Sequence, residues 1–130
     1  MKAVRRHVLG GQAVVKRKRV YREAVAQVGF VEWLRARPDW KVTRIENEGK
    51  RTPAQTAQAK AMGMTPGDTD LLLIYKTTVI WWELKEGKGE LSDNQLGVHA
   101  ELIARCQRVV VTRGLDDSIA TAIKIEETWT

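Results

Sequence analysis

Hydrophobic residues recur along most of this 130-residue chain with the spacing of a helix or of a strand. Over residues 21–35 they recur every three or four positions, which is the period of an amphipathic helix. Tyr21, Val25 and Val28 fall on the expected apolar side of that helix. Pro38 should end it, because proline lacks the backbone donor that a further turn requires. The pattern therefore predicts a helix near the start of the chain.

Four later segments favour β-strands, because they are short runs rich in β-branched and aromatic residues. They cover residues 40–46, 69–75, 78–85 and 108–112. The unbroken apolar run in the last of them predicts a strand that is buried on both faces. The second and third are close enough in the sequence to form a hairpin.

Three further helices are predicted from their start signals. Proline after a threonine, a capping box and a pair of aspartates each favour the beginning of a helix. The helices are residues 53–62 after Thr52, a segment to about Arg105 after Ser92, and a segment to about Ile125 after Asp116 or Asp117. Trp129 is expected to pack back on the core. The order α-β-α-β-β-α-β-α predicts an α/β fold with a mixed β-sheet flanked by helices.

The hairpin brings charged residues together at one end of a hydrophobic sheet. If the turn is centred on residues 76–77, Asp70 lies directly opposite Glu83. Opposed residues have Cβ atoms about 4.5–5.5 Å apart on the same face. Lys85 is two residues beyond Glu83 and shares that face. The register thus predicts a cluster of two carboxylates and one lysine.

Two carboxylates about 5 Å apart repel by roughly 3 kcal/mol at an effective dielectric constant of about 20. One carboxyl group could stay protonated, or a divalent cation could lie between the two. Oxygen ligands favour Mg²⁺ or Mn²⁺. Lys85 could then orient a water molecule or stabilise negative charge on a phosphate. The alternative is a structural ion pair of Lys85 with Glu83 or Asp70.

The segments TPGDTDLLLIY and WWELKEGKGELSDNQ resemble the VRR-NUC (virus-type replication–repair nuclease) family of the PD-(D/E)xK superfamily. The matching motifs, in chain order, are Gly67-x-x-Asp70, Glu83-x-Lys85 and Leu91-Ser92-x-x-Gln95. The resemblance covers about residues 21–114. Asp68 and Thr69 depart from it, since the family usually has an apolar or small residue and then proline there. Asp68 is therefore a second, weaker candidate ligand.

The resemblance implies a restriction-endonuclease-like core and a DNA endonuclease that depends on Mg²⁺ or Mn²⁺. It implies that the metal ligands are Asp70, Glu83 and the backbone carbonyl of Leu84, with Lys85 acting on the attacking water. Gln95 would support the site from the start of its helix. Glu23 is the best match to a further glutamate on the first helix, with Gln27 one turn on and Glu32 as the competing choice. Stand-alone members of the family are expected to be homodimers that cut branched DNA such as Holliday junctions.

Positive charge is concentrated at the amino terminus. The net charge is +6, and residues 1–22 contain eight Lys or Arg and no acidic residue. Residues 1–20 are therefore interpreted as a basic arm that precedes a single nuclease-like domain over residues 21–130. Such an arm suits nucleic-acid phosphate, and a solvated tail is the alternative. The candidate phosphate contacts are Lys16, Arg17, Lys18, Arg19, Lys50, Arg51 and Lys88.

Other residues narrow the class of protein. The chain has one cysteine and so no internal disulfide, and two distant histidines argue against a zinc site. His99 lies one turn after Gln95, where a structural role is favoured over substrate contact. No apolar run approaches the length of a membrane span and no secretory segment is apparent, so a cytoplasmic bacterial or phage-encoded protein without a membrane partner is expected. The rival functions are a non-catalytic DNA-binding protein and a nuclease for other DNA, either restriction-type or single-strand.

Overall fold

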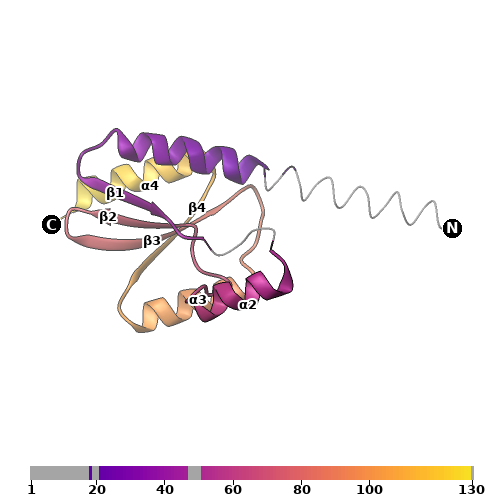
Figure 1. The fold of residues 1–130 in the computed structure, drawn as a ribbon. Helices are drawn as coiled ribbons and strands as arrows, with labels where there is room; N and C mark the ends of the chain where they lie inside the picture. Colours follow the sequence, from indigo (N-terminus) through magenta and orange to yellow (C-terminus); the bar gives the residue numbers. More distant parts are fainter. Residues whose placement is uncertain (1–17, 19–20, 47–50, 130) are drawn as a thin grey trace.

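The computed structural model describes residue 18 and residues 21–46 and 51–129. A first helix over residues 21–35 precedes seven further elements, shown in Figure 1. In chain order these are β1 (Trp40–Arg44), α2 (Pro53–Ala61), β2 (Leu71–Tyr75), β3 (Thr78–Lys85), α3 (Asp93–Ala104), β4 (Arg108–Arg113) and α4 (Gly114–Thr128). This order and the α/β class agree with the prediction.

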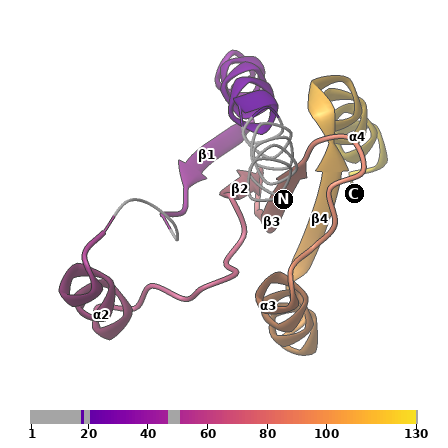
Figure 2. The same cartoon turned by 90° about the vertical axis from the view of Figure 1, so that its right-hand side faces the viewer.

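The four strands form one mixed sheet in the order β1-β2-β3-β4. The β1–β2 and β2–β3 pairs are antiparallel and the β3–β4 pair is parallel. Figure 2 shows the first helix and α4 on one side of the sheet, with α2 and α3 on the other. The sheet therefore has two faces with different helical cover.

The hydrophobic core lies between the sheet, the first helix and α4. Its buried residues come from every strand except β4 and are Phe30, Leu34, Trp40, Leu71, Leu73, Tyr75, Ile80, Trp82, Leu84 and Ala122. The rings of Phe30 and Trp82 pack at 5.0 Å between centroids. Trp129 meets the Tyr75 ring edge-on at 5.5 Å, as its predicted packing requires.

The apolar side predicted for the first helix is wrong. Tyr21, Val25 and Val28 are 71 %, 53 % and 58 % exposed, whereas Phe30 and Leu34 are fully buried. Phe30 and Leu34 stand one turn apart on an adjacent face. That face meets the sheet, because the large Phe30 and Leu34 side chains bury more apolar surface there than the valines could.

The prediction that the fourth strand is buried on both faces is also wrong. β4 pairs only with β3 and is an edge of the sheet, and its Val111 is exposed. Its apolar run packs against α3 and α4 from two sides without being enclosed. The strand is one residue longer than predicted, since it continues to Arg113.

Other element boundaries also differ from the prediction, including the end of α4, which is Thr128 and not Ile125. α4 begins at Gly114 directly after β4, so the aspartates lie inside its first turn. Asp117 still serves the helix start, because its Oδ2 accepts the Arg113 backbone N–H at 2.8 Å. β1 ends at Arg44 and β2 begins at Leu71, so both strands are two residues shorter than predicted. Asp70 therefore lies just before the ladder.

The start of α3 is fixed by its own residues and by a close contact. Ser92 caps the helix and exchanges side-chain to backbone hydrogen bonds with Gln95, which confirms the predicted capping box. Gly67 has φ +91°, and a Cβ there would lie 2.4 Å from the backbone of Asn94. Only glycine allows the turn before β2 to approach the helix so closely.

α2 is a surface helix, as its small and polar residues predict, and none of its residues is buried. A capping box at Thr52 begins it and Gly63, with φ +111°, follows its end. Of the predicted basic arm, the structure describes Lys18 alone, in helical conformation and exposed. Within the described ranges, no helix has both the length and the apolar character that crossing a membrane requires.

Candidate active site

The predicted hairpin register is confirmed. Leu71 pairs with Trp82 and Tyr75 pairs with Thr78. Asp70 consequently lies across from Glu83 at the open end of the hairpin. Its Oδ2 accepts the backbone N–H of the residue after Glu83, Leu84, at 2.7 Å. The Asp70 carboxylate is thus hydrogen-bonded to β3, the strand that carries Glu83.

Glu83 faces away from the main core. Its strand neighbours Trp82 and Leu84 point into the core, so alternation places Glu83 on the α3 side of the sheet. The residue is 1 % exposed, and its Oε1 has no hydrogen-bond partner. On α3, His99 Nε2 lies 3.5 Å from that oxygen.

The electrostatics of Glu83 follow from this burial. Its pKa is raised from 4.5 to about 10, first by burial and then by the neighbouring Asp70 through hydrogen bonding and repulsion. Lys85 acts in the opposite direction, and Glu23 adds a small repulsion. Four charged groups therefore act on one another at this end of the sheet. A nearby positive charge would favour the ionised form of Glu83.

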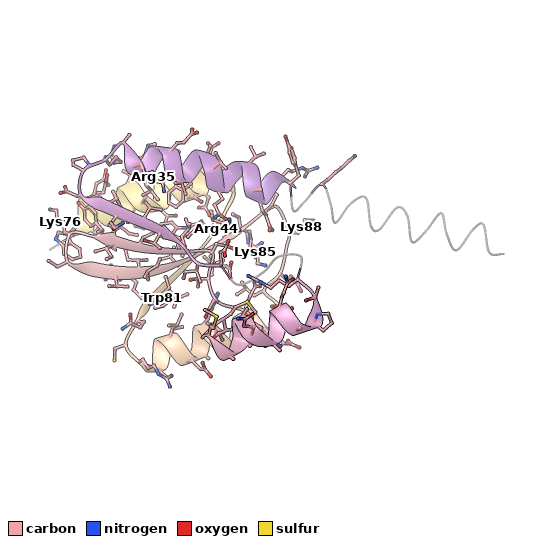
Figure 3. All side chains as sticks on the ribbon, in the orientation of Figure 1. Arg35, Arg44, Lys76, Trp81, Lys85 and Lys88 are labelled. Atoms are coloured by element: carbon pink, nitrogen blue, oxygen red, sulfur yellow. The ribbon has the colours of Figure 1, made fainter. Side chains whose placement is uncertain are left out.

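Lys85 is half-buried at the last position of β3. It also acts on His99, whose pKa is lowered first by burial and then by the charge of Lys85, while Asp70 raises it. Figure 3 shows Lys85 at the same end of the molecule as Lys88 and Arg44. The predicted trio of Asp70, Glu83 and Lys85 is therefore together in space.

The first helix reaches the site through Glu23. Its Oε1 accepts the backbone N–H of Glu86, the residue after Lys85, at 3.2 Å. From the other side, Arg113 donates from Nη1 to the carbonyl oxygen of Gly87 at 3.1 Å and to that of Gly89. The loop that follows β3 is thus held from two elements that lie far apart in the sequence.

A groove of about 560 Å³ lies between the first helix and β1 and ends at Asp70. Gln27 and Glu32, the two alternatives to Glu23, line this groove, and so do the cations Arg35 and Arg44. Glu23 lies at the loop after β3 instead. Asp68 is half-buried and its pKa is raised mainly by burial.

Gln95 is placed at the start of α3, where its Oε1 accepts the Ser92 backbone N–H at 2.9 Å. Lys88 is exposed on the loop after β3. Arg51 donates to the sulfur of Met64 at 3.4 Å. The remaining predicted phosphate contacts lie outside the described residues and are Lys16, Arg17, Arg19 and Lys50.

The contacts of His99 and Arg113 were missed by sequence reasoning. His99 follows Gln95 by one helical turn, and its burial was anticipated, but its approach to Glu83 was not. Arg113 is the last residue of β4, and nothing in the neighbouring sequence indicates its bonds to Gly87 and Gly89. Both contacts join segments whose relative position depends on the assembled sheet.

Two carboxylates and a strand carbonyl suit a hard divalent cation. Glu83 Oε1 is buried without a partner beside a second carboxylate, which is an arrangement that a cation would relieve. Over residues 18, 21–46 and 51–129, no group of three or more His, Cys, Asp or Glu side chains could hold a metal ion. The side-chain donors would therefore be Asp70 and Glu83, with Leu84 supplying its carbonyl. These donors fit Mg²⁺ or Mn²⁺.

Comparison with known proteins identifies the architecture. No family model matches the sequence, and no curated protein matches it. Among solved structures, a VRR_NUC domain protein is 19 % identical over 79 % of this chain and 86 % of its own, with a TM-score of 0.64. A second structure, a VRR_NUC domain, is 20 % identical over 84 % of this chain and 98 % of its own, with a TM-score of 0.57. This chain has the fold of the VRR_NUC domain.

Proposed function

We propose that this protein is a divalent-metal-dependent DNA endonuclease of the VRR-NUC family. The observation that carries the proposal is the cluster of Asp70, Glu83 and Lys85 at one end of the sheet in a VRR_NUC fold. Glu83 is buried without a hydrogen bond at Oε1, which a purely structural glutamate would avoid. The ion pair considered as the alternative leaves this orphaned oxygen unexplained.

The residues of the cluster have separate roles in phosphodiester hydrolysis. Asp70 and Glu83 hold the cation, and Asp70 keeps its orientation through the Leu84 backbone N–H. When bound, Mg²⁺ or Mn²⁺ supplies Lewis-acid polarisation of the phosphate and lowers the pKa of water. Lys85 orients the attacking water and stabilises the charge that develops on the phosphate. Gln95 lies at the start of α3, and we propose that it supports the same site.

Positively charged side chains around the site suit a polyanionic substrate such as DNA. Arg44 and Lys88 are exposed toward the end of the molecule that carries Lys85 (Figure 3). Phosphate contacts of this kind supply affinity that does not depend on sequence. We propose that the substrate is branched DNA such as a Holliday junction and that the enzyme acts as a homodimer, since a two-fold axis places two sites across two strands.

The test is cleavage of labelled four-way junction, flap and linear duplex DNA in Mg²⁺, in Mn²⁺ and in EDTA. The wild type is expected to cut with either metal and to be inactive in EDTA. Lys85→Ala should reduce cleavage by about 10²–10³-fold, the range for loss of one charge-stabilising donor. Lys124→Ala, an exposed lysine on α4, is the matched control and should cut normally. Absence of cleavage with both metals, or full activity of Lys85→Ala, overturns the proposal.

The same assay separates the rival functions. A protein that binds junctions but cuts nothing is a non-catalytic DNA-binding protein with the nuclease fold. Preference for a short palindrome in linear duplex indicates a restriction-type enzyme. Sedimentation of the protein alone and with a junction tests the dimer, and a monomer in both conditions removes that part of the proposal.

A further inference from the structure

Two buried polar atoms face each other at the edge of the site. Among the described residues, the only buried side-chain nitrogen or oxygen atoms without a hydrogen-bond partner are Glu83 Oε1 and His99 Nε2. They are 3.5 Å apart, and the side chains of His99 and Glu83 are 9 % and 1 % exposed. Each atom left without water or a partner costs free energy. The simplest relief is a hydrogen bond between the two.

The position of His99 does not depend on that contact. α3 is fixed at its start by the Ser92–Gln95 capping box and by the close approach of Gly67 to Asn94. Val98, next to His99, is also buried. The helix therefore presents the His99 ring to β3 through contacts that involve neither Glu83 nor the ring itself.

An apolar side chain would fill the space of His99 without leaving polar atoms unpaired. Replacing both members of a buried polar pair by apolar groups is often neutral or stabilising, so stability alone does not account for this histidine. The contact between His99 and Glu83 is instead explained if function requires a fixed orientation of the Glu83 carboxylate. Histidine and carboxylate partners commonly orient the groups that ligate a metal.

We propose that His99 is a positioning residue that donates its Nε2–H to Glu83 Oε1 and so fixes the orientation of that carboxylate toward Asp70. The inference rests on the proposed function, because it assigns Glu83 a ligand role that requires a fixed direction. With one oxygen held from α3, the other is directed to the space shared with Asp70. Within the hairpin the Glu83 side chain interacts with Asp70 through a hydrogen bond, and His99 adds a restraint from α3.

The experiment compares substitutions that keep or remove the donor. His99→Gln can place an amide N–H near the position of Nε2. His99→Leu fills a similar volume without a donor, and His99→Asn carries the same amide as glutamine on a side chain one methylene shorter. Mn²⁺ is the probe, and its affinity is measured by calorimetry in the full-length protein.

His99→Leu and His99→Asn are expected to bind Mn²⁺ about 10–100-fold more weakly than the wild type, as loss of an orienting partner does elsewhere. His99→Gln should stay within about threefold of the wild type. The melting temperatures of the variants in EDTA should not fall in this order. If His99 served only for packing, its substitutions would change the melting temperature without changing the affinity for Mn²⁺. Cleavage should fall in the same order as Mn²⁺ affinity.

Two results overturn the inference: wild-type Mn²⁺ affinity in His99→Leu, or a loss in His99→Gln as large as in His99→Leu. If His99→Leu does not fold, the contrast of His99→Gln with His99→Asn decides, and equal affinities count against the donor. If the wild type binds Mn²⁺ through Glu83 but cuts no DNA, the proposed nuclease activity fails. The positioning role of His99 would still be supported by the expected order of Mn²⁺ affinities.

If the wild type binds no Mn²⁺, the proposed function fails and the contact is judged in EDTA. A cycle of Glu83→Gln, His99→Leu and the double variant is then measured by urea unfolding. Coupled residues should depart from additivity by about threefold or more in the unfolding equilibrium constant. Additive effects overturn the inference independently of any enzymatic assay.

Discussion

Two glutamates at opposite ends of the molecule differ in how the fold treats their charge. Glu126 on α4 accepts hydrogen bonds from Arg37 Nε and Nη2, both at 2.6 Å, and from Trp40 Nε1 at 2.9 Å. Its pKa is lowered, first by Arg37. Glu83 on β3 is more deeply buried and keeps one oxygen without a hydrogen bond, and its pKa is raised to about 10, first by burial and then by Asp70.

The difference separates a stabilising carboxylate from a costly one. Glu126 joins α4 to the turn after the first helix, and Arg37 also lies over the Trp33 ring at 4.5 Å. Glu83 instead keeps one buried oxygen without a hydrogen-bond partner, which costs free energy in the absence of a cation. A destabilising group of this kind is retained where function requires it, because residues placed for activity commonly lower the stability of the fold.

Changing Glu83 to glutamine should give the largest effect. Glu83→Gln replaces a charged ligand by a neutral amide, and cleavage should fall by about 10³-fold, equivalent to several kcal/mol of lost charge stabilisation. The same variant should melt at a higher temperature than the wild type in EDTA at pH 8, because the amide is neutral in both states, whereas Glu83 must take up a proton to fold at this pH. A lower melting temperature would show that the Glu83 charge is already stabilised without metal.

The pH dependence of the free energy of unfolding tests whether the fold raises the pKa of Glu83. The pKa of Glu83 is 4.5 unperturbed and about 10 in the folded state. Between these values the folded state keeps a proton that the unfolded state has released, so stability falls as pH rises through this window. Urea unfolding of the wild type in EDTA should show this fall, and Glu83→Gln should be flatter. Identical slopes in the two proteins would contradict the raised pKa.

A smaller effect is expected from the loop that follows the Glu83 strand. Arg113 donates to the carbonyl oxygens of Gly87 and Gly89, in the loop that begins after Lys85. Arg113→Ala releases these carbonyls and should lower the cleavage rate at saturating DNA about tenfold, since small displacements of catalytic groups are costly. Arg113→Lys should be intermediate, because an ammonium lacks the fork of the guanidinium.

Arg105→Ala is the matched control for the Arg113 substitutions. Arg105 also donates from Nη1 to a carbonyl oxygen, but that of Glu101 in its own helix, at 2.9 Å. Its loss should leave cleavage unchanged. Equal activity of the two alanine variants would show that the loop keeps its shape without Arg113.

The hairpin and its charged residues were predictable because they depend on local order. Alternation and a short turn fix the register, so the opposition of Asp70 and Glu83 follows from counting residues. The helix starts at Thr52 and Ser92 were predictable for the same reason, since a cap acts within three residues. These features need no knowledge of distant partners.

Features that depend on the assembled fold were not predictable in this way. Phe30 and Leu34 outcompete Val25 and Val28 for the sheet only once the sheet exists. The exposure of β4 depends on strand order, which an apolar run does not encode. The approach of His99 to Glu83 requires the packing of α3 on the sheet, and the bond from Arg37 to Glu126 spans most of the chain.

The smallest effect is expected from the matched substitution at the satisfied carboxylate, Glu126→Gln. The amide keeps hydrogen bonding to Trp40 possible but loses the charge that pairs with Arg37. Because Arg37 is partly exposed, the melting temperature should fall by only a few degrees, and cleavage should be unchanged.

The pH dependence at Glu126 should have the opposite sign to that at Glu83. The folded pKa of Glu126 lies below its unperturbed 4.5, so its contribution is present above that value and is lost as pH falls through the folded pKa. The wild type and Glu126→Gln should therefore differ in urea midpoint at neutral pH and converge in acid. Glu83→Gln should differ from the wild type most at alkaline pH. If both variants converge with the wild type in the same pH range, the fold affects the two carboxylates in the same way. The environment of Glu83 would then no longer mark it as the functional carboxylate.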